Sequence, residues 1–68
     1  MNTPHKMEHV VQSDNYDRWN NGQFSICRYS EWNGKSGTFF IAYDLHKLSQ
    51  RINQIPVATF EEALALCK

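Results

Sequence analysis

The side chains best suited to metal binding or nucleophilic catalysis are two cysteines and three histidines. Cys27 and Cys67 lie far apart and match no spacing that is typical of zinc ligands. His5 and His9 have the i, i+4 spacing that aligns two imidazoles on a helix, but they precede the first clear element of the chain. His46 has no partner at a ligand spacing. We therefore expect no metal ion and two reduced thiols.

No arrangement of residues in the chain is typical of an enzyme. Cys27 lies in an alternating strand pattern, where a cysteine is usually a small hydrophobic residue, and Cys67 has no local motif. The run Gly34-Lys35-Ser36 matches the end of a phosphate-binding loop, but the glycine that such a loop needs upstream is absent. Glu61 and Glu62 are explained by a helix cap and the helix dipole. The sequence predicts no catalytic residue and no cofactor.

Cations and aromatic side chains converge in the middle of the chain, and they are the candidates for partner contact. Lys35 lies in a polar loop, with Arg28 and Trp32 just before it. Tyr, Trp and Arg are the residue types that are enriched at the centres of protein interfaces. The partner-binding residues predicted from the sequence are Arg18, Arg28, Tyr29, Trp32 and Lys35.

Length and charge exclude several classes of protein. The chain has 68 residues, which is one small domain and too short for separate cofactor and substrate domains. Seven Lys and Arg balance seven Asp and Glu, so the long-range field that draws generic nucleic-acid binders to phosphate is missing. The apolar run 39–43 is far shorter than the roughly 20 residues that span a bilayer. Because residues 1–12 contain no stretch typical of a signal peptide, we expect a cytoplasmic protein.

A first hairpin is predicted around Asn21-Gly22, the preferred dipeptide of a two-residue type I′ turn. If these residues form the turn, Trp19 faces Phe24 on one surface of the sheet. The next segment, 23–32, alternates with a period of two. One side carries Phe24, Ile26, Arg28, Ser30 and Trp32, and the other carries Ser25, Cys27, Tyr29 and Glu31.

A second hairpin is predicted over the polar loop 33–37, which contains two glycines. The strand 38–45 beyond it is rich in β-branched and aromatic residues and is apolar on both sides, which is typical of a central strand. Phe39, Ile41, Tyr43 and Leu45 share one side, and Phe40, Ala42 and Asp44 share the other.

The C-terminal segment predicts a helix with a capping box. In this motif the Thr59 hydroxyl accepts from the backbone amide of Glu62, and the Glu62 carboxylate reaches back. The helix is expected from about 60 to 67, with Phe60, Ala63, Leu64 and Cys67 on the face toward the sheet. In the preceding segment, 44–55, apolar residues recur near a helical period, and both a helix and irregular structure stay open.

We therefore predict an α+β fold, a small three-stranded antiparallel meander sheet packed by a capped C-terminal helix, with a second short helix at 45–54 as an open alternative. Residues 1–15 are expected to form a loosely ordered N-terminal segment, and residues 16–68 a single α+β domain. The order of the elements over 16–68 resembles, in architecture, the arm-type DNA-binding domains of phage-like integrases. That resemblance implies a three-stranded sheet that enters the major groove. The strands predicted here carry Asp17, Glu31 and Asp44 beside Arg18, Arg28 and Lys35.

Nine aromatic residues exceed what one helix can cover on a three-stranded sheet, so some are expected to stay exposed or to meet a partner. Because the net charge is neutral, we expect a small non-enzymatic protein-binding module, of the kind that phages and mobile elements encode to bind or inhibit a larger protein. The alternatives are a nucleic-acid-binding domain with an aromatic and basic sheet face, and a homodimer. The competing structural expectation is that the N-terminal segment and 44–55 close both faces.

Overall fold

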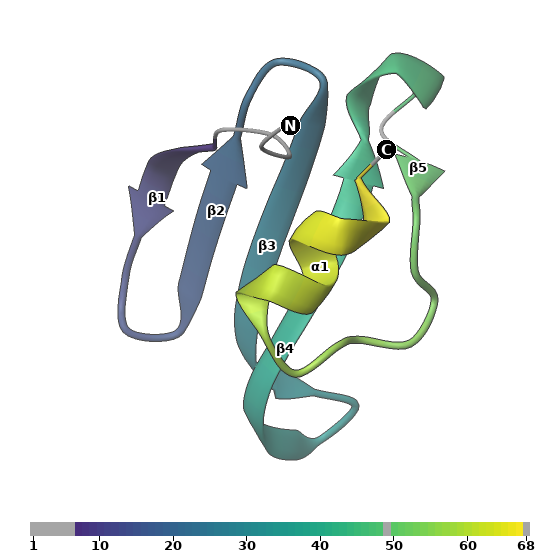
Figure 1. The fold of residues 1–68 in the computed structure, drawn as a ribbon. Coiled ribbons are helices and arrows are strands. Elements are labelled where there is room, and N and C mark those ends of the chain that lie inside the picture. The colour runs from purple at the N-terminus through teal and green to yellow at the C-terminus, as the bar shows by residue number, and fades with distance from the viewer. Residues whose placement is uncertain (1–6, 49, 68) are drawn as a thin grey trace.

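The computed structural model of this chain describes residues 7–48 and 50–67. Its main element is one sheet of five antiparallel strands that follow one another in sequence order. The strands are β1 (Glu8–Gln12), β2 (Tyr16–Asn20), β3 (Phe24–Trp32), β4 (Lys35–Asp44) and β5 (Gln50–Arg51). A short 3-10 helix, η1 (Leu45–Lys47), follows β4, and an α-helix, α1 (Phe60–Leu66), lies across β3 and β4 (Figure 1).

The prediction of a three-stranded sheet is wrong, because β1 and β5 add a strand at each edge. β1 lies within the predicted N-terminal segment and pairs with β2, so that His9 is opposite Trp19. β5 pairs with the end of β4, where Arg51 is opposite Tyr43. β1 is exposed along its whole length and β5 has two residues, so neither strand carries a clear apolar alternation of its own. Both are defined by pairing with a neighbouring strand.

The alternative of a helix at 45–54 is also wrong. The Asp44 carboxylate accepts a hydrogen bond from the His46 amide at 3.0 Å and begins η1. Leu48 ends this single turn in the left-handed conformation, with a φ of 56°. The helical spacing of the apolar residues is not used, because Leu48 is 99% and Ile55 is 80% exposed. Ile52 packs instead against the core beneath α1.

The first predicted hairpin is present, but its register differs from the prediction. Trp19 pairs with Ile26 and not with Phe24. The Asn21 backbone amide donates to the Phe24 carbonyl at 3.2 Å, which makes Asn21 the residue before the loop. The loop then has its positive φ, 88°, at Gly22. Because the register shift is two residues, Trp19 keeps its predicted face of the sheet.

The second hairpin is tighter than the predicted loop 33–37. Trp32 pairs directly with Lys35, so the loop consists of Asn33 and Gly34. Their φ angles are 52° and 81°, as a two-residue type I′ turn requires. The Asn-Gly preference for this turn is therefore realised in the second hairpin.

A β-bulge in β4 lies opposite the part of β3 that precedes Trp32. The register with β4 shifts between Tyr29 and Glu31. Over this interval β3 advances by two residues and β4 by three, so the extra residue is in β4 and the alternation of β3 continues. The ring contacts of Trp32, and not the register, place its side chain beside Tyr29, with centroids 5.5 Å apart, and beside Arg51.

The capped C-terminal helix is confirmed. The Glu62 amide donates to the Thr59 hydroxyl at 3.1 Å, and this hydroxyl donates to the Glu62 carboxylate at 3.1 Å. Regular helix ends at Leu66, one residue before the predicted end. The predicted stripe packs on the sheet, with Ala63 and Cys67 buried in the core and Phe60 and Leu64 beside them.

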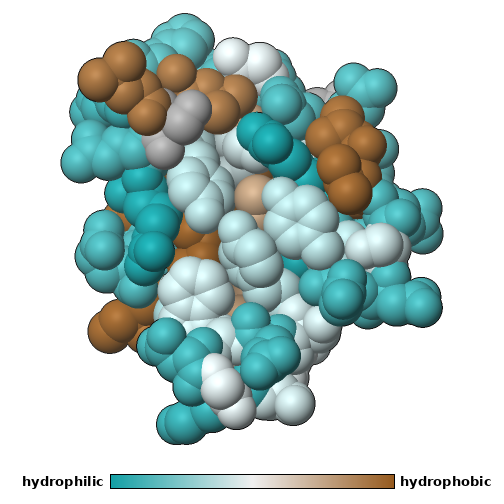
Figure 2. Space-filling view, turned by 180° about the vertical axis from the view of Figure 1, so that it is seen from behind, coloured by the Kyte–Doolittle hydropathy of each residue, from teal (hydrophilic) through white to brown (hydrophobic). Residues whose placement is uncertain are grey.

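The two faces of the sheet differ in their cover. α1 lies on one face, and the segment that precedes it runs along the edge of β4, where Val57 forms a backbone bridge to Phe40. Within residues 7–48 and 50–67, no element covers the other face, which we call the open face (Figures 1 and 2). The expectation that the N-terminal segment and residues 44–55 close both faces of the sheet is not met, because β1 and β5 extend the sheet at its edges. The covered core includes Phe24, Ile26, Phe40, Ala42, Ala63 and Cys67.

Candidate functional site

The open face carries an unusual concentration of aromatic side chains. The strand register aligns Tyr16 with Tyr29 and Tyr29 with Phe39, and it aligns Tyr43 with Arg51. Figure 2 shows this face, where pale aromatic side chains gather at the centre and both hydrophilic and hydrophobic side chains lie around them. The strand residues that the register places on the open face and that are used below are Tyr16, Arg18, Cys27, Tyr29, Tyr43 and Arg51. Trp32 joins them because its ring contacts Tyr29 and Arg51, and Lys35 is its register partner.

The rings form a continuous row along the face. The Tyr16 and Tyr29 ring centroids are 5.4 Å apart, and the Tyr29 and Trp32 centroids are 5.5 Å apart. The hydroxyl oxygens of Tyr29 and Tyr43 are 3.3 Å apart. All four side chains are half-buried. Each therefore combines a large apolar surface with a polar edge in reach of a ligand, which suits a binding surface.

Three cationic side chains lie along this row, and none forms an ion pair with a described carboxylate. The Arg51 guanidinium lies over the Trp32 ring, 5.3 Å from its centroid. Arg18 donates through Nε to a serine hydroxyl of β3 at 3.0 Å, and Lys35 is exposed. The register places two carboxylates on this side, Glu8 at the β1 edge and Glu31, which alternates with Tyr29 in β3. Three cations against two carboxylates make this side weakly basic although the whole chain is neutral.

A hollow of about 220 Å³ opens among the tyrosines. Cys27 lines it and is only 4% exposed, and its Sγ is 3.3 Å from the Tyr16 hydroxyl. Burial, together with this hydrogen bond, raises the pKa of Tyr16 to about 12. Burial and the contact with the Tyr43 hydroxyl raise the pKa of Tyr29 as well. The hollow is lined by Tyr16, Arg18, Cys27, Tyr29, Tyr43 and Leu45.

The predicted partner-binding residues divide between the two faces. Arg18, Tyr29, Trp32 and Lys35 come together on the open face, whereas Arg28 lies on the opposite face, in register with Asp17 and Phe40. The sequence prediction did not include four members of the open face, Tyr16, Cys27, Tyr43 and Arg51. The alternation of 38–45 indicates the side of Tyr43, but the places of Tyr16 and Arg51 depend on strand pairing.

Arg28 is already engaged in a partly buried cluster on the α1 side. Its Nε donates to the carboxylate of Asp17, which is 8% exposed. His9 Nε2 lies 2.9 Å from the other carboxylate oxygen. Burial acts to raise the pKa of Asp17, but the hydrogen bonds from Arg28 and His9 outweigh it and hold the pKa below the usual 3.8. This cluster joins β1, β2 and β3.

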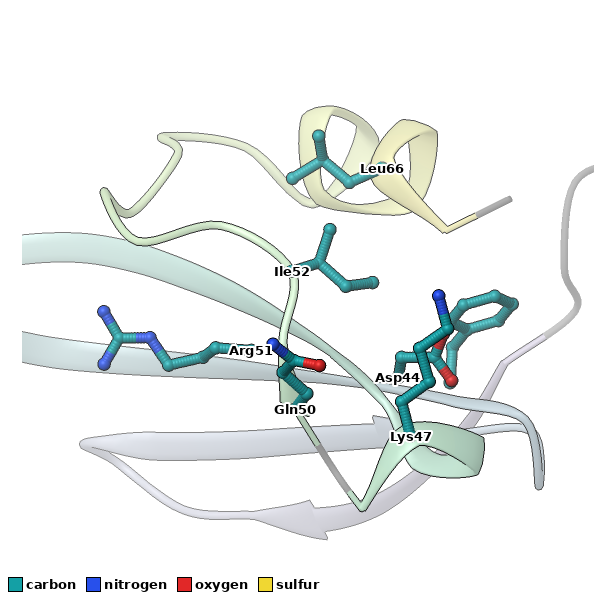
Figure 3. Close-up of a pocket in the computed structure, with 7 residues that line it drawn as sticks. Asp44, Lys47, Gln50, Arg51, Ile52 and Leu66 are labelled. Carbon is teal, nitrogen blue, oxygen red and sulfur yellow. The ribbon is translucent and has the colours of Figure 1, made fainter.

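A second hollow, of about 250 Å³, lies between η1, β5 and α1 (Figure 3). Asp44 and Lys47 border it on one side and Ile52 and Leu66 on the other, while the Arg51 side chain points away. None of its polar lining residues is buried. Since no desolvated polar group is aimed at a ligand here, we assign it no function.

The two thiols lie on opposite faces of the sheet, Cys27 on the open face and Cys67 beneath α1. Both thiols are buried. Burial, and then the Asp44 charge, raises the pKa of Cys67 to about 11. Among the described residues no group of three or more His, Cys, Asp or Glu could hold a metal ion, and His5 lies outside them.

Comparisons with known proteins do not add to this geometry. No family model, curated protein or solved structure matches the chain. Within the part of the chain that the structure describes, no helix is long and apolar enough to cross a membrane.

Proposed function

We propose that this chain is a small non-enzymatic binding module that holds a single-stranded nucleic acid on the open face. The observation that carries the proposal is the row of aromatic rings next to three cations without an ion-pair partner among the described residues. Aromatic rings stack on bases of every type, and neighbouring cations neutralise the phosphates. A sheet face of this composition supplies both interactions at once.

The local charge favours a nucleic acid over the protein partner expected from the sequence. Net charge sums both faces of the sheet, but an exposed charge acts over a Debye length of about 8 Å at physiological ionic strength. On the α1 side, Asp17 neutralises Arg28, and Glu61 and Glu62 lie on the helix. A ligand on the open face therefore meets three cations, Arg18, Lys35 and Arg51, and two carboxylates, Glu8 and Glu31. Tyr, Trp and Arg also suit protein interfaces, so a protein partner is the other outcome of the test.

The test is the affinity for a short labelled oligothymidylate, measured by fluorescence anisotropy over a range of salt concentrations. Three phosphate contacts predict a slope of about −2 in a plot of log affinity against log salt. Lys35→Gln is expected to reduce that slope by about 0.7, because it removes one contact. The matched control is Lys47→Gln, since Lys47 lies on η1 beside α1 and not on the open face.

The proposal fails if the strand does not bind at low salt. It also fails if Lys35→Gln and Lys47→Gln change the slope equally, because the open face would then have no special part in binding. Salt-insensitive binding of one protein, without binding of the strand, would support the protein partner instead.

A further inference from the structure

We infer that the hollow among the tyrosines receives a single base of the bound strand, an assignment that rests on the proposed nucleic-acid binding. Its volume of about 220 Å³ lies below the about 300–1,000 Å³ of sites for drug-sized ligands. It therefore suits one ring system and not a whole nucleotide. Tyr16, Tyr29 and Tyr43 contribute aromatic walls, and Leu45 contributes an aliphatic edge.

The polar groups of the lining suit the edge of a base. Arg18 uses its Nε for the Ser25 hydroxyl, at 3.0 Å, so its two terminal amino groups have no described protein acceptor. The hydroxyls of Tyr29 and Tyr43 share a hydrogen bond of 3.3 Å that either of them can donate. Such donors match a base that presents carbonyl oxygens, such as thymine or uracil. A stacked base with these hydrogen bonds satisfies both the apolar and the polar parts of the lining.

A phosphate is not the occupant that this lining favours. Arg18 is the one cation among the residues that line the hollow, and Lys35 and Arg51 lie at the other end of the row, beside Trp32. The ring faces are negative, and an anion loses hydration against them. The aromatic lining therefore places the base among the tyrosines. The two cations beside Trp32 place the sugar-phosphate backbone at that end of the row.

The experiment compares an oligothymidylate with an abasic strand of the same length at low salt, where both carry the same phosphates. Oligothymidylate is expected to bind at least about tenfold more tightly, because one stacked base contributes about that factor. Bases stacked elsewhere on the open face would add to this difference in affinity. A variant is therefore needed to show how much of the difference comes from the hollow. Leu45→Trp fills the hollow and is expected to remove most of the preference while leaving the affinity for the abasic strand unchanged.

The matched control is Leu48→Trp, because Leu48 is 99% exposed and lies outside the lining of the hollow. The wild-type Leu45 methyl resonances are expected to shift upfield when oligothymidylate binds, since a ring then lies over them. If the amide spectrum shows that Leu45→Trp does not fold, Tyr43→Leu takes its place and is expected to reduce the preference for oligothymidylate over the abasic strand. Tyr43→Phe keeps the ring and is expected to retain most of this preference.

The outcomes separate this inference from the proposed function. If both strands bind equally, or if Leu45→Trp keeps the wild-type preference, the base site is overturned while nucleic-acid binding stands. If neither strand binds at low salt, both proposals are overturned. A preference that Leu45→Trp loses and Leu48→Trp keeps supports the base site.

Discussion

The imidazole of His9 stacks on the indole of Trp19, with ring centroids 4.6 Å apart and planes inclined by 13°. The same imidazole places Nε2 2.9 Å from an Asp17 carboxylate oxygen. β1 is exposed along its whole length and lies at the edge of the sheet. One histidine side chain therefore connects this edge strand both to the aromatic core and to the buried carboxylate.

Replacing His9 is expected to loosen β1. His9→Ala should lower the free energy of unfolding by about 1 kcal/mol, because it removes an aromatic stacking pair. His9→Phe keeps a ring over Trp19 and should recover part of the loss. Urea unfolding measures the change in the free energy of unfolding. Amide hydrogen exchange shows whether the loss of stability lies in β1. Unchanged exchange in His9→Ala would contradict this role of the stacking.

Asp17 is expected to make the protein less stable in acid. Its pKa is lowered in the folded chain, so its contribution is fully present above the usual value of 3.8 and is lost as the pH falls through the folded value. Asp17→Asn should cost about 1–3 kcal/mol at neutral pH, since Arg28 loses its carboxylate partner. Asp14→Asn, on an exposed residue, is the control. Urea unfolding at neutral and acid pH gives the free energy of unfolding that each variant loses on acidification. This loss is expected to be smaller in Asp17→Asn than in the control.

Tyr16 is expected to make the protein less stable in alkali. Burial and the Cys27 hydrogen bond raise its pKa from 10.0 to about 12. Stability from this group is therefore fully present below pH 10 and is lost as the pH rises through 12. Absorbance of tyrosinate should show late ionisation, and Tyr16→Phe should unfold with a weaker dependence on alkaline pH. The same alkaline transition in both proteins would refute the assignment.

The capping box is expected to stabilise α1 measurably. Thr59→Ala should lower the free energy of unfolding by about 1 kcal/mol, because the Glu62 amide loses its acceptor. Thr59→Ser keeps a hydroxyl and should stay close to wild type. Denaturant unfolding of the three proteins gives the comparison. An equal loss in the serine variant would show that the threonine methyl group, and not the cap, supplies the stability.

The candidate site was predictable only in part. Residue types alone indicated Arg18, Tyr29, Trp32 and Lys35, because Tyr, Trp and Arg are typical of binding surfaces. Their common side was not predictable, because alternation separates Trp32 from Tyr29 along β3 and only the ring contact in the folded chain brings them together. Arg51 joins Trp32 through a two-residue strand that has no sequence pattern of its own.

Local interactions explain what the sequence by itself determined. The Thr59 cap, the glycine-containing turns and the alternation of 38–45 each depend on residues within a few positions of one another, so their preferences are visible in the order of the residues. Only the tertiary structure decided the five-stranded sheet, the bulge and the face covered by α1. Both faces of β4 carry apolar residues, so the choice between them depends on packing against α1. The separation of charge between the faces follows from that choice, because it depends on which side each strand presents and not on the composition of the chain.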